Sequence, residues 1–268
     1  MTQACVDEDR AVAYGSVADE PLLLDVHRPP ARATPRPAVV HVHGGGMWTG
    51  SRADMADPAR QLARAGYVAF AVDYRLVDAA AGRHRWPAQL DDVQRAVRWV
   101  RANAARYGVD PGRVGAYGWS AGGQLAALLG TRDTRAETDP ALADWPSRVE
   151  CVVALAGDVD LAAYTRPPAL HEVVALLGGT PAEVPERYRD ASSLSWIDAR
   201  TAPFLVVHGA RDDVVPVGQS RRLVSALRAA GVEVEYVELP DASHGDLAWS
   251  RVGPAALAFL GRHLRPGD

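Results

Sequence analysis

The chain has 268 residues, of which 48% are hydrophobic and 23% charged, with a net charge of −4. This composition is typical of a soluble globular protein with a sizeable core, and an acidic balance without a basic face argues against nucleic-acid binding. All 29 basic residues are arginine. The lack of lysine excludes Schiff-base lysine chemistry and a Walker-type phosphate loop.

The cysteines and the N-terminal residues indicate a compartment. Cys5 and Cys151 lack metal-ligand spacing and fit a reducing environment. Residues 1–10 are acidic where a secretory signal would be basic and then apolar, and no later apolar run approaches the roughly 18 residues that span a bilayer. We therefore expect a cytoplasmic protein without a membrane partner.

The first half of the chain alternates between predicted strands and helices. Residues 1–20 are predicted to be a polar, partly disordered N-terminal tail that holds at most a short strand near 12–14. Residues 21–268 are predicted to form a single domain. Its first elements are strands at 22–27 and 38–43, a helix at 57–65, a strand at 67–73 and an amphipathic helix at 87–107.

The second half continues the alternation. A strand from Val114 runs into a turn at Ser120 and a helix to 129, followed by strands at 149–156 and 204–208, a helix at 217–230, a strand at 234–239 and a helix at 253–264. This order predicts the α/β class, with a mostly parallel central sheet flanked by helices. Residues 157–202 are too long for a plain loop and are predicted to form a small helical, cap-like insertion over the site.

The pattern Gly-x-Ser-x-Gly at residues 118–122 joins a strand directly to a helix. A serine at such a tight turn has a strained backbone, and glycines are needed where a side chain would collide with the neighbouring elements. The turn would expose the Ser120 hydroxyl and place the Ala121 N–H at a helix start. The pattern alone also occurs in ordinary glycine-rich turns.

An acid and a histidine follow the ends of two later strands. Asp212 comes after the strand at 204–208 and His244 after the strand at 234–239, which is the order serine, acid, histidine. Considered alone, Asp212 has a non-catalytic interpretation as a loop carboxylate that caps the next helix, although Asp213 suits that role better. Considered alone, His244 would be a solvated loop histidine. Their joint placement instead predicts a base and its orienting acid for Ser120.

Three glycines follow the strand at 38–43 and bring bare backbone N–H groups to the same edge of the sheet. The expected oxyanion donors are Gly45, Gly46 and Ala121. A phosphate-binding loop is the rival interpretation, but the chain lacks the helix directly behind and the lysine. His43 is expected to brace this loop through a hydrogen bond.

Residues that flank these positions complete the predicted site. Met47, Trp48 and Trp119 are candidates to bind substrate, although Trp119 fits the core equally well. Trp145, Tyr164, His171 and Trp196 are expected to face the pocket, and His27, His84 and His263 are expected to lie at the surface. No metal site and no cofactor are predicted.

With these motifs combined, the chain resembles serine esterases of the α/β-hydrolase fold. Within that fold it is similar to the esterase/lipase group that is related to hormone-sensitive lipase and to bacterial acetylxylan and feruloyl esterase-like enzymes. The matching segments are His43-Gly44-Gly45-Gly46, residues 73–76, 86–89 and 106–111, the serine turn, His208-Gly209 with Asp212 and Val215-Pro216, and His244-Gly245.

The resemblance implies roles for individual residues. Ser120 would be the nucleophile, His244 the general base and acid, and Asp212 the orienting carboxylate, since the family spacing favours Asp212 over Asp213. Asp158 and Asp160 are the alternative acids, because some members of the fold place the acid one strand earlier. The chain departs from the secreted members in showing no export signal, and the 157–202 insertion matches no pattern.

The expected function is hydrolysis of a carboxylic ester of a small intracellular substrate through an acyl-enzyme, with no nucleic-acid or membrane partner and the oligomeric state left open. An amidase or formamidase, a peptidase, and an acyl-processing or lyase step in a biosynthetic pathway would use the same machinery. A non-catalytic binding protein on the same fold is the alternative from another class.

Overall fold

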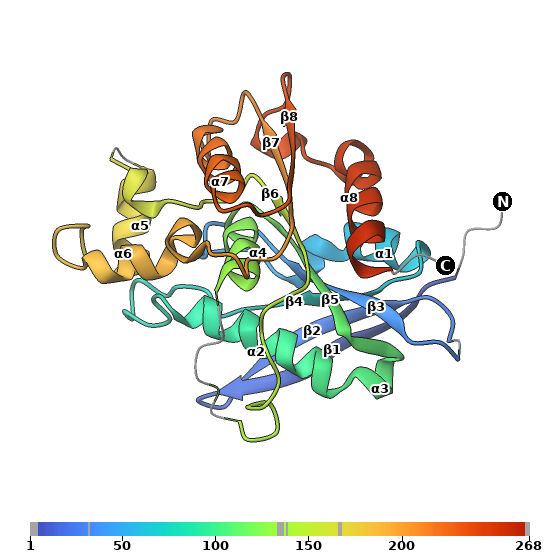
Figure 1. Ribbon diagram of the computed structural model, residues 1–268. Helices are drawn as coiled ribbons and strands as arrows, with labels where there is room; N and C mark the ends of the chain where they lie inside the picture. Colours follow the sequence, from blue (N-terminus) through green and yellow to red (C-terminus); the bar gives the residue numbers. More distant parts are fainter. Residues whose placement is uncertain (1–4, 32, 133–136, 138, 166–167, 266–268) are drawn as a thin grey trace.

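A computed structural model describes residues 5–265 apart from residues 32, 133–136, 138 and 166–167. Figure 1 shows a central twisted sheet with helices on both of its faces. The sheet has the strand order β1-β2-β4-β3-β5-β6-β7-β8. Its strands are β1 (Asp7–Val17), β2 (Glu20–Arg28), β3 (Arg36–Val42), β4 (Val68–Val72), β5 (Val109–Trp119), β6 (Val152–Leu155), β7 (Phe204–Gly209) and β8 (Val234–Leu239).

The predicted α/β class with a mostly parallel sheet is confirmed. Strands β4, β3, β5, β6, β7 and β8 are parallel to one another, whereas β2 is antiparallel to both of its neighbours, β1 and β4. Parallel strands buried on both faces are continuously apolar, as the fully buried β4 illustrates. Because the parallel strands all end at one edge, the loops that follow them meet there.

Helices cover the sheet in two layers. They are α1 (Ala56–Arg64), α2 (Ala88–Ala102), α3 (Ala104–Tyr107), α4 (Ala121–Thr131), α7 (Gly218–Ala229) and α8 (Trp249–Leu264). One core joins α2, α4 and α7 to side chains such as Val40, and the other joins α1 and α8 to side chains such as Val39. Side chains of adjacent β3 residues thus pack in opposite layers, because successive side chains of a strand point to opposite faces of the sheet.

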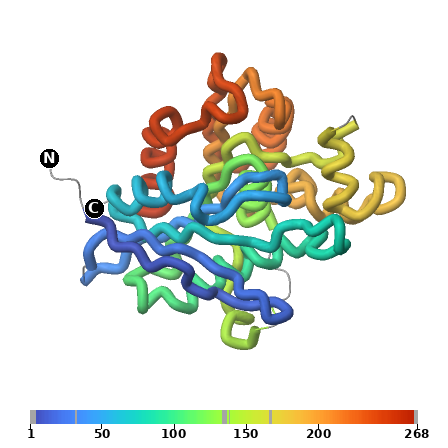
Figure 2. The backbone as a smooth tube through the Cα atoms, turned by 180° about the vertical axis from the view of Figure 1, so that it is seen from behind, coloured from blue at the N-terminus to red at the C-terminus, as the bar shows by residue number. Residues whose placement is uncertain are grey.

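The N-terminal tail differs from the prediction, because β1 occupies residues 7–17 and pairs with β2 along the outside of the sheet (Figure 2). Only Tyr14 of β1 is buried, so the apolar alternation that marks a strand in a sequence is missing. Ala18 and Asp19, both with positive φ, make the tight turn between the two strands. Cross-strand pairing and the Arg28–Asp9 ion pair hold β1 in place.

The predicted helix at 87–107 is interrupted at Asn103, whose side-chain amide donates to the Trp99 carbonyl at 2.9 Å. The predicted insertion at 157–202 is helical. It contains η2 (Leu161–Ala163), α5 (Ala169–Leu177), α6 (Pro185–Ala191) and η3 (Ser193–Trp196), and it projects from one side of the sheet in Figure 1. Among the described residues, no helix is long and apolar enough to cross a bilayer.

Candidate active site

Ser120 lies at the sharp turn between β5 and α4, with φ 57° and ψ −125°. A Cβ on Gly118 would approach the Gly122 carbonyl oxygen to 2.0 Å, and a Cβ on Gly122 would approach the Val42 carbonyl oxygen to the same distance. Both glycines are therefore required for β5, β3 and α4 to meet at this point. The Ser120 N–H donates to the Leu155 carbonyl of β6 at 2.8 Å, which anchors the strained residue.

The structure brings Ser120, His244 and Asp212 together from three separate strand ends. Ser120 Oγ lies 2.9 Å from His244 Nε2, and His244 Nδ1 lies 2.7 Å from Asp212 Oδ2. His244 opens the 3-10 turn η4 (His244–Asp246) after β8, and Asp212 follows β7. The His244 side chain is 12% exposed and the Asp212 side chain is fully buried. The connected hydrogen bonds allow a proton to pass from Ser120 to the imidazole while a carboxylate holds the ring.

Four N–H groups surround the Asp212 carboxylate. Oδ1 accepts from the Val214 and Val215 amides at 3.0 and 2.8 Å, and Oδ2 lies near both His244 and His208. Burial favours the neutral acid, but the hydrogen bonds prevail and hold the pKa of Asp212 well below its usual range. Asp212 is thus a carboxylate at neutral pH.

The other acids considered for this role have different partners. Asp158 accepts the Tyr164 hydroxyl, and burial raises the pKa of this acid. Asp160 lies 3.5 Å from the guanidinium of Arg222. Asp213 is exposed, and the expectation that it caps α7 is wrong, because α7 begins without a side-chain cap.

The glycine loop after β3 has an unusual backbone. Gly45, Gly46 and Met47 have φ values of 109°, 64° and 73°. His43 Nδ1 donates to the Gly44 carbonyl at 2.7 Å, as expected for a bracing residue. The His43 ring also stacks on Tyr74 with a centroid distance of 4.2 Å. A Cβ at Gly45 would lie 2.1 Å from the Thr49 carbonyl oxygen, so the loop closes tightly on itself.

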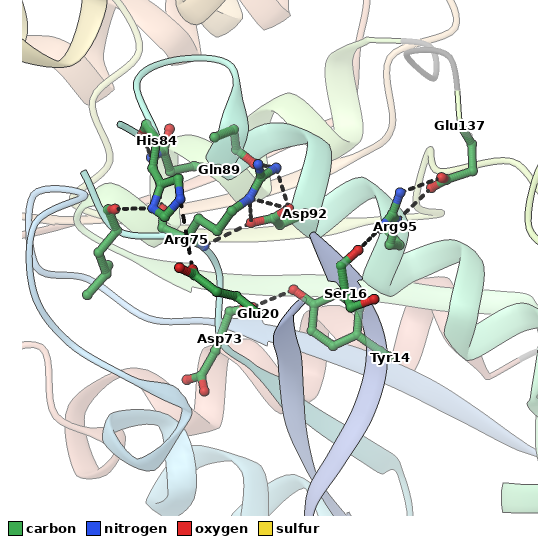
Figure 3. A network of polar contacts seen from close by, with 12 residues as sticks. Tyr14, Ser16, Glu20, Asp73, Arg75, His84, Gln89, Asp92, Arg95 and Glu137 are labelled. Atoms are coloured by element: carbon green, nitrogen blue, oxygen red, sulfur yellow. Dashed lines mark hydrogen bonds and ion pairs between the residues drawn. The ribbon is translucent and has the colours of Figure 1, made fainter. Parts of the chain in front are cut away.

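A polar network fixes the segment that supports this loop, as Figure 3 shows. The Tyr14 hydroxyl donates to the Asp73 carbonyl at 2.6 Å. Arg75, two residues on, forms an ion pair at 2.7 Å with Asp92 of α2, whose side chain is 2% exposed. Gln89 donates to the Arg75 carbonyl at 2.9 Å. Tyr74, between these anchored residues, is thereby held against His43.

A cavity of about 1030 Å³ opens above Ser120. Its wall includes Met47, Trp48 and Trp119, the three residues expected to bind substrate, and the Trp119 ring lies 5.2 Å from that of His244. The insertion closes one side with Leu161 of η2, with Tyr164 directly after η2, and with residues of α5 that include His171. The insertion therefore lies over the site.

Two tryptophans expected at this cavity do not line it. Trp145 is absent from its wall, and Trp196 lines a second cavity, where the Arg132 guanidinium lies 4.0 Å from the Trp196 ring. The sequence indicated that Trp196 belongs to the insertion but not which way its side chain points. The fold of α6 and η3 turns it away from Ser120.

The three histidines expected at the surface show how weakly a sequence predicts burial. His27 was expected at the surface but is 1% exposed, and burial lowers its pKa. The His84 and His263 side chains are also mostly covered, at 22% and 14% exposure. One side-chain N or O atom each of Glu233, directly before β8, of Glu235 in β8 and of His263 in α8 lie within 4.8 Å of one another. Arg262 already pairs with Glu235, which accounts for one of these acids.

Comparison with known proteins adds independent information. The family BD-FAE matches residues 24–227. Esterase LipC of Mycobacterium tuberculosis is 38% identical over 260 residues, which cover 93% of this chain and 63% of LipC. Esterase LipQ of the same organism is 33% identical over 265 residues, with coverages of 93% and 61%. The chain spans about 60% of the length of these relatives.

Solved structures agree with this relationship. A truncated carbohydrate esterase from gut microbiota superposes with a TM-score of 0.84 at 25% identity, over 99% of both chains. Butyrate-bound Est2, an esterase of the planctomycete Thermogutta terrifontis, has a TM-score of 0.80 at 28% identity, over 100% of this chain and 97% of Est2. Because the family match spans most of the sequence and LipC is similar over nearly all of it, the chain belongs to the BD-FAE family of α/β-hydrolases.

Proposed function

We propose that this protein is a serine hydrolase that cleaves a carboxylic ester through an acyl-enzyme. The observation that carries the proposal is the unbroken set of hydrogen bonds from Ser120 through His244 to a buried, ionised Asp212. A serine hydroxyl is a weak nucleophile at neutral pH, and this arrangement supplies the base and orients it.

In the proposed reaction, Ser120 Oγ attacks the acyl carbon while His244 Nε2 takes the hydroxyl proton. Asp212 stabilises the resulting imidazolium and does not itself take up the proton. His244 then donates the proton to the leaving alcohol. Water, activated by the same imidazole, attacks the acyl-enzyme, and the acid is released as Ser120 regains its proton.

The oxyanion of each tetrahedral intermediate would be held by the backbone amides of Gly45, Gly46 and Ala121. Ala121 is the first residue of α4, so its N–H has no acceptor within the helix. Gly45 and Gly46 line the cavity beside Ser120 in the left-handed conformation that the braced loop imposes. Pre-positioned donors of this kind each contribute roughly two to three orders of magnitude to turnover.

The substrate is proposed to be a small ester with a short acyl group. The cavity is lined by Met47, Trp48 and Trp119 close to the serine, which favours an uncharged acyl or alcohol group. LipC and LipQ are named esterases, and Est2 is described with butyrate bound. The cytoplasmic location stays a prediction.

The decisive experiment compares the native protein with Ser120→Ala. The native protein should hydrolyse short p-nitrophenyl esters and react with a fluorophosphonate probe at Ser120, and Ser120→Ala should lose both properties with an unchanged melting temperature. Ser195→Ala, which alters an exposed serine of η3, is the control and should behave as native. Turnover that survives in Ser120→Ala would refute the assignment.

The same assay separates the alternatives. Faster turnover of an aryl formamide or a peptide than of the matched ester would make the protein an amidase, a formamidase or a peptidase. Products other than a free acid and an alcohol would indicate lyase chemistry. A native protein that neither reacts with the probe nor turns over any ester would be a binding protein on this fold.

A further inference from the structure

We propose that His208 and Ser220 are positioning residues that hold the Asp212 carboxylate in place for His244. Ser220 Oγ lies 2.7 Å from His208 Nδ1, and His208 Nε2 lies 3.2 Å from Asp212 Oδ2. The same carboxylate oxygen lies 2.7 Å from His244 Nδ1. One oxygen of Asp212 therefore lies between two histidines, each of which is hydrogen-bonded to a serine. The inference rests on the proposed function, since it concerns the acid of that site.

The neighbours of His208 determine which ring nitrogen carries the proton. His208 Nε2 faces the Val215 carbonyl at 2.9 Å and the ionised Asp212 carboxylate, and both of these groups only accept hydrogen bonds. Nε2 must therefore carry a hydrogen, which it shares between them. In the neutral ring Nδ1 then has no hydrogen and accepts the hydrogen of the Ser220 hydroxyl, which can donate as well as accept.

Both residues are set in rigid, buried elements. His208 belongs to β7 and is 0% exposed, and Ser220 belongs to α7 and is 1% exposed. Asp212 lies on the loop between these two elements, where the Val214 and Val215 amides hold only Oδ1. The His208 N–H fixes the second oxygen, so the carboxylate has no freedom to rotate away from His244.

The His208 N–H also reduces how strongly the Asp212 carboxylate stabilises a protonated His244. Without the His208 N–H, Oδ2 would serve His244 alone and would stabilise the protonated imidazole more strongly. His244 would then stay protonated, and so unable to act as the base, up to a higher pH. The acid limb of the kcat/KM profile would move to higher pH. Other groups facing this cluster are Asp158 after β6, hydrogen-bonded to Tyr164, and Glu238 of β8, paired with Arg221. The variants below leave all of them in place.

The test compares His208→Leu, His208→Gln and Ser220→Ala by ester hydrolysis across pH. In His208→Leu we expect kcat to fall about tenfold at little change in KM, and the acid limb to move up by roughly half to one pH unit. His208→Gln should return the acid limb toward native, because its side-chain amide can donate to the same oxygen. Ser220→Ala should shift the limb in the same direction as His208→Leu, by less.

His41→Leu is the matched control, because His41 is an equally buried strand histidine in β3 that lies outside the cavity wall. It should keep the native pH profile even if it lowers stability. The downfield proton resonance of the His244–Asp212 hydrogen bond gives a second readout, which should move in His208→Leu and stay unchanged in His41→Leu.

Two outcomes would overturn the inference. Equal losses of activity in His208→Leu and His208→Gln, with a native acid limb in both, would leave His208 with a packing role only. If His208→Leu does not fold, a native acid limb and a native kcat in Ser220→Ala would refute the positioning role of the Ser220–His208 contact. Failure of the proposed function is recognised separately, because the native protein would then show neither ester turnover nor probe labelling at Ser120.

Discussion

Replacing Asp212 by asparagine tests the electrostatic logic of the site most directly. The carboxylate has N–H donors on both sides, the Val214 and Val215 amides at Oδ1 and the two histidines at Oδ2. Asparagine exchanges one acceptor oxygen for an NH₂ group. In either orientation of the amide, this new donor faces two other donors.

The less disruptive orientation leaves the amide oxygen on the backbone N–H groups and points the NH₂ at His244. His244 would then adopt the tautomer with a bare Nδ1 and a protonated Nε2, and Nε2 could no longer take the proton of Ser120. We expect kcat/KM to fall by about 10³- to 10⁴-fold, as for loss of the correct tautomer in other serine hydrolases. The unsatisfied donors should lower the free energy of unfolding by about 1–3 kcal/mol.

This loss of stability should depend on pH with a defined sign. The pKa of Asp212 is depressed in the folded protein, so the carboxylate stabilises the fold above its unfolded pKa of about 3.9 and loses this contribution as the pH falls below it. Asparagine does not titrate. The difference in stability between the native protein and Asp212→Asn should therefore be full at neutral pH and shrink on acidification below about pH 4.

The assay combines p-nitrophenyl acetate kinetics at pH 7–9 with urea unfolding between pH 3 and 7. Asp213→Asn is the matched control, because it makes the same chemical change at the adjacent, exposed carboxylate. Near-native kinetics in Asp212→Asn, or an equal loss in Asp213→Asn, would refute the reasoning.

Three further predictions concern the supports of the site. Gly122→Ala places a Cβ 2.0 Å from the Val42 carbonyl oxygen and should cost at least about 3 kcal/mol of stability in urea unfolding. Gly261→Ala in α8 meets no atom within 4 Å and should be neutral or stabilising by up to about 1 kcal/mol; similar losses in both would contradict the steric argument. Asp92→Leu leaves the Arg75 guanidinium without its buried partner and should lower the free energy of unfolding by about 3–5 kcal/mol in urea unfolding; an unchanged free energy of unfolding would contradict a stabilising role for this ion pair. Asp158→Asn should lower kcat/KM far less than Asp212→Asn, because Asp158 accepts the Tyr164 hydroxyl whereas the hydrogen bond of His244 Nδ1 goes to Asp212; an equal loss would make Asp158 the acid.

The parts of the fold that were predictable are those with a local signature. The buried parallel strands are continuous apolar runs, and most of the helices begin and end close to the predicted residues. The serine turn was predictable because its pattern lies within five residues of chain, and a Cβ on Gly118 would meet the Gly122 carbonyl of the same turn; the clash of a Gly122 Cβ with Val42 of β3 became visible only in the structure. The polar strand β1 was missed, since its stability comes from pairing with β2 and from ion pairs, which leave no apolar period in the sequence.

The candidate site was predictable in its order along the chain but not in its contacts. The residue types after successive strands indicated Ser120, Asp212 and His244, because parallel strands deliver their ends to one edge of the sheet. The preference for Asp212 over Asp158 and Asp160 came from a resemblance, and the physical reason for it is the set of four donors around Asp212.

By itself, the sequence determined the strand–helix alternation, the serine turn and the order of the polar residues, because each depends on neighbours in the chain. Only the tertiary structure decided that His27 is buried, that Trp196 faces a second cavity, and that His208 lies behind Asp212. These facts depend on contacts between residues of separate elements. Periodicity and propensity describe one element at a time, so such contacts become visible only when the sheet is assembled.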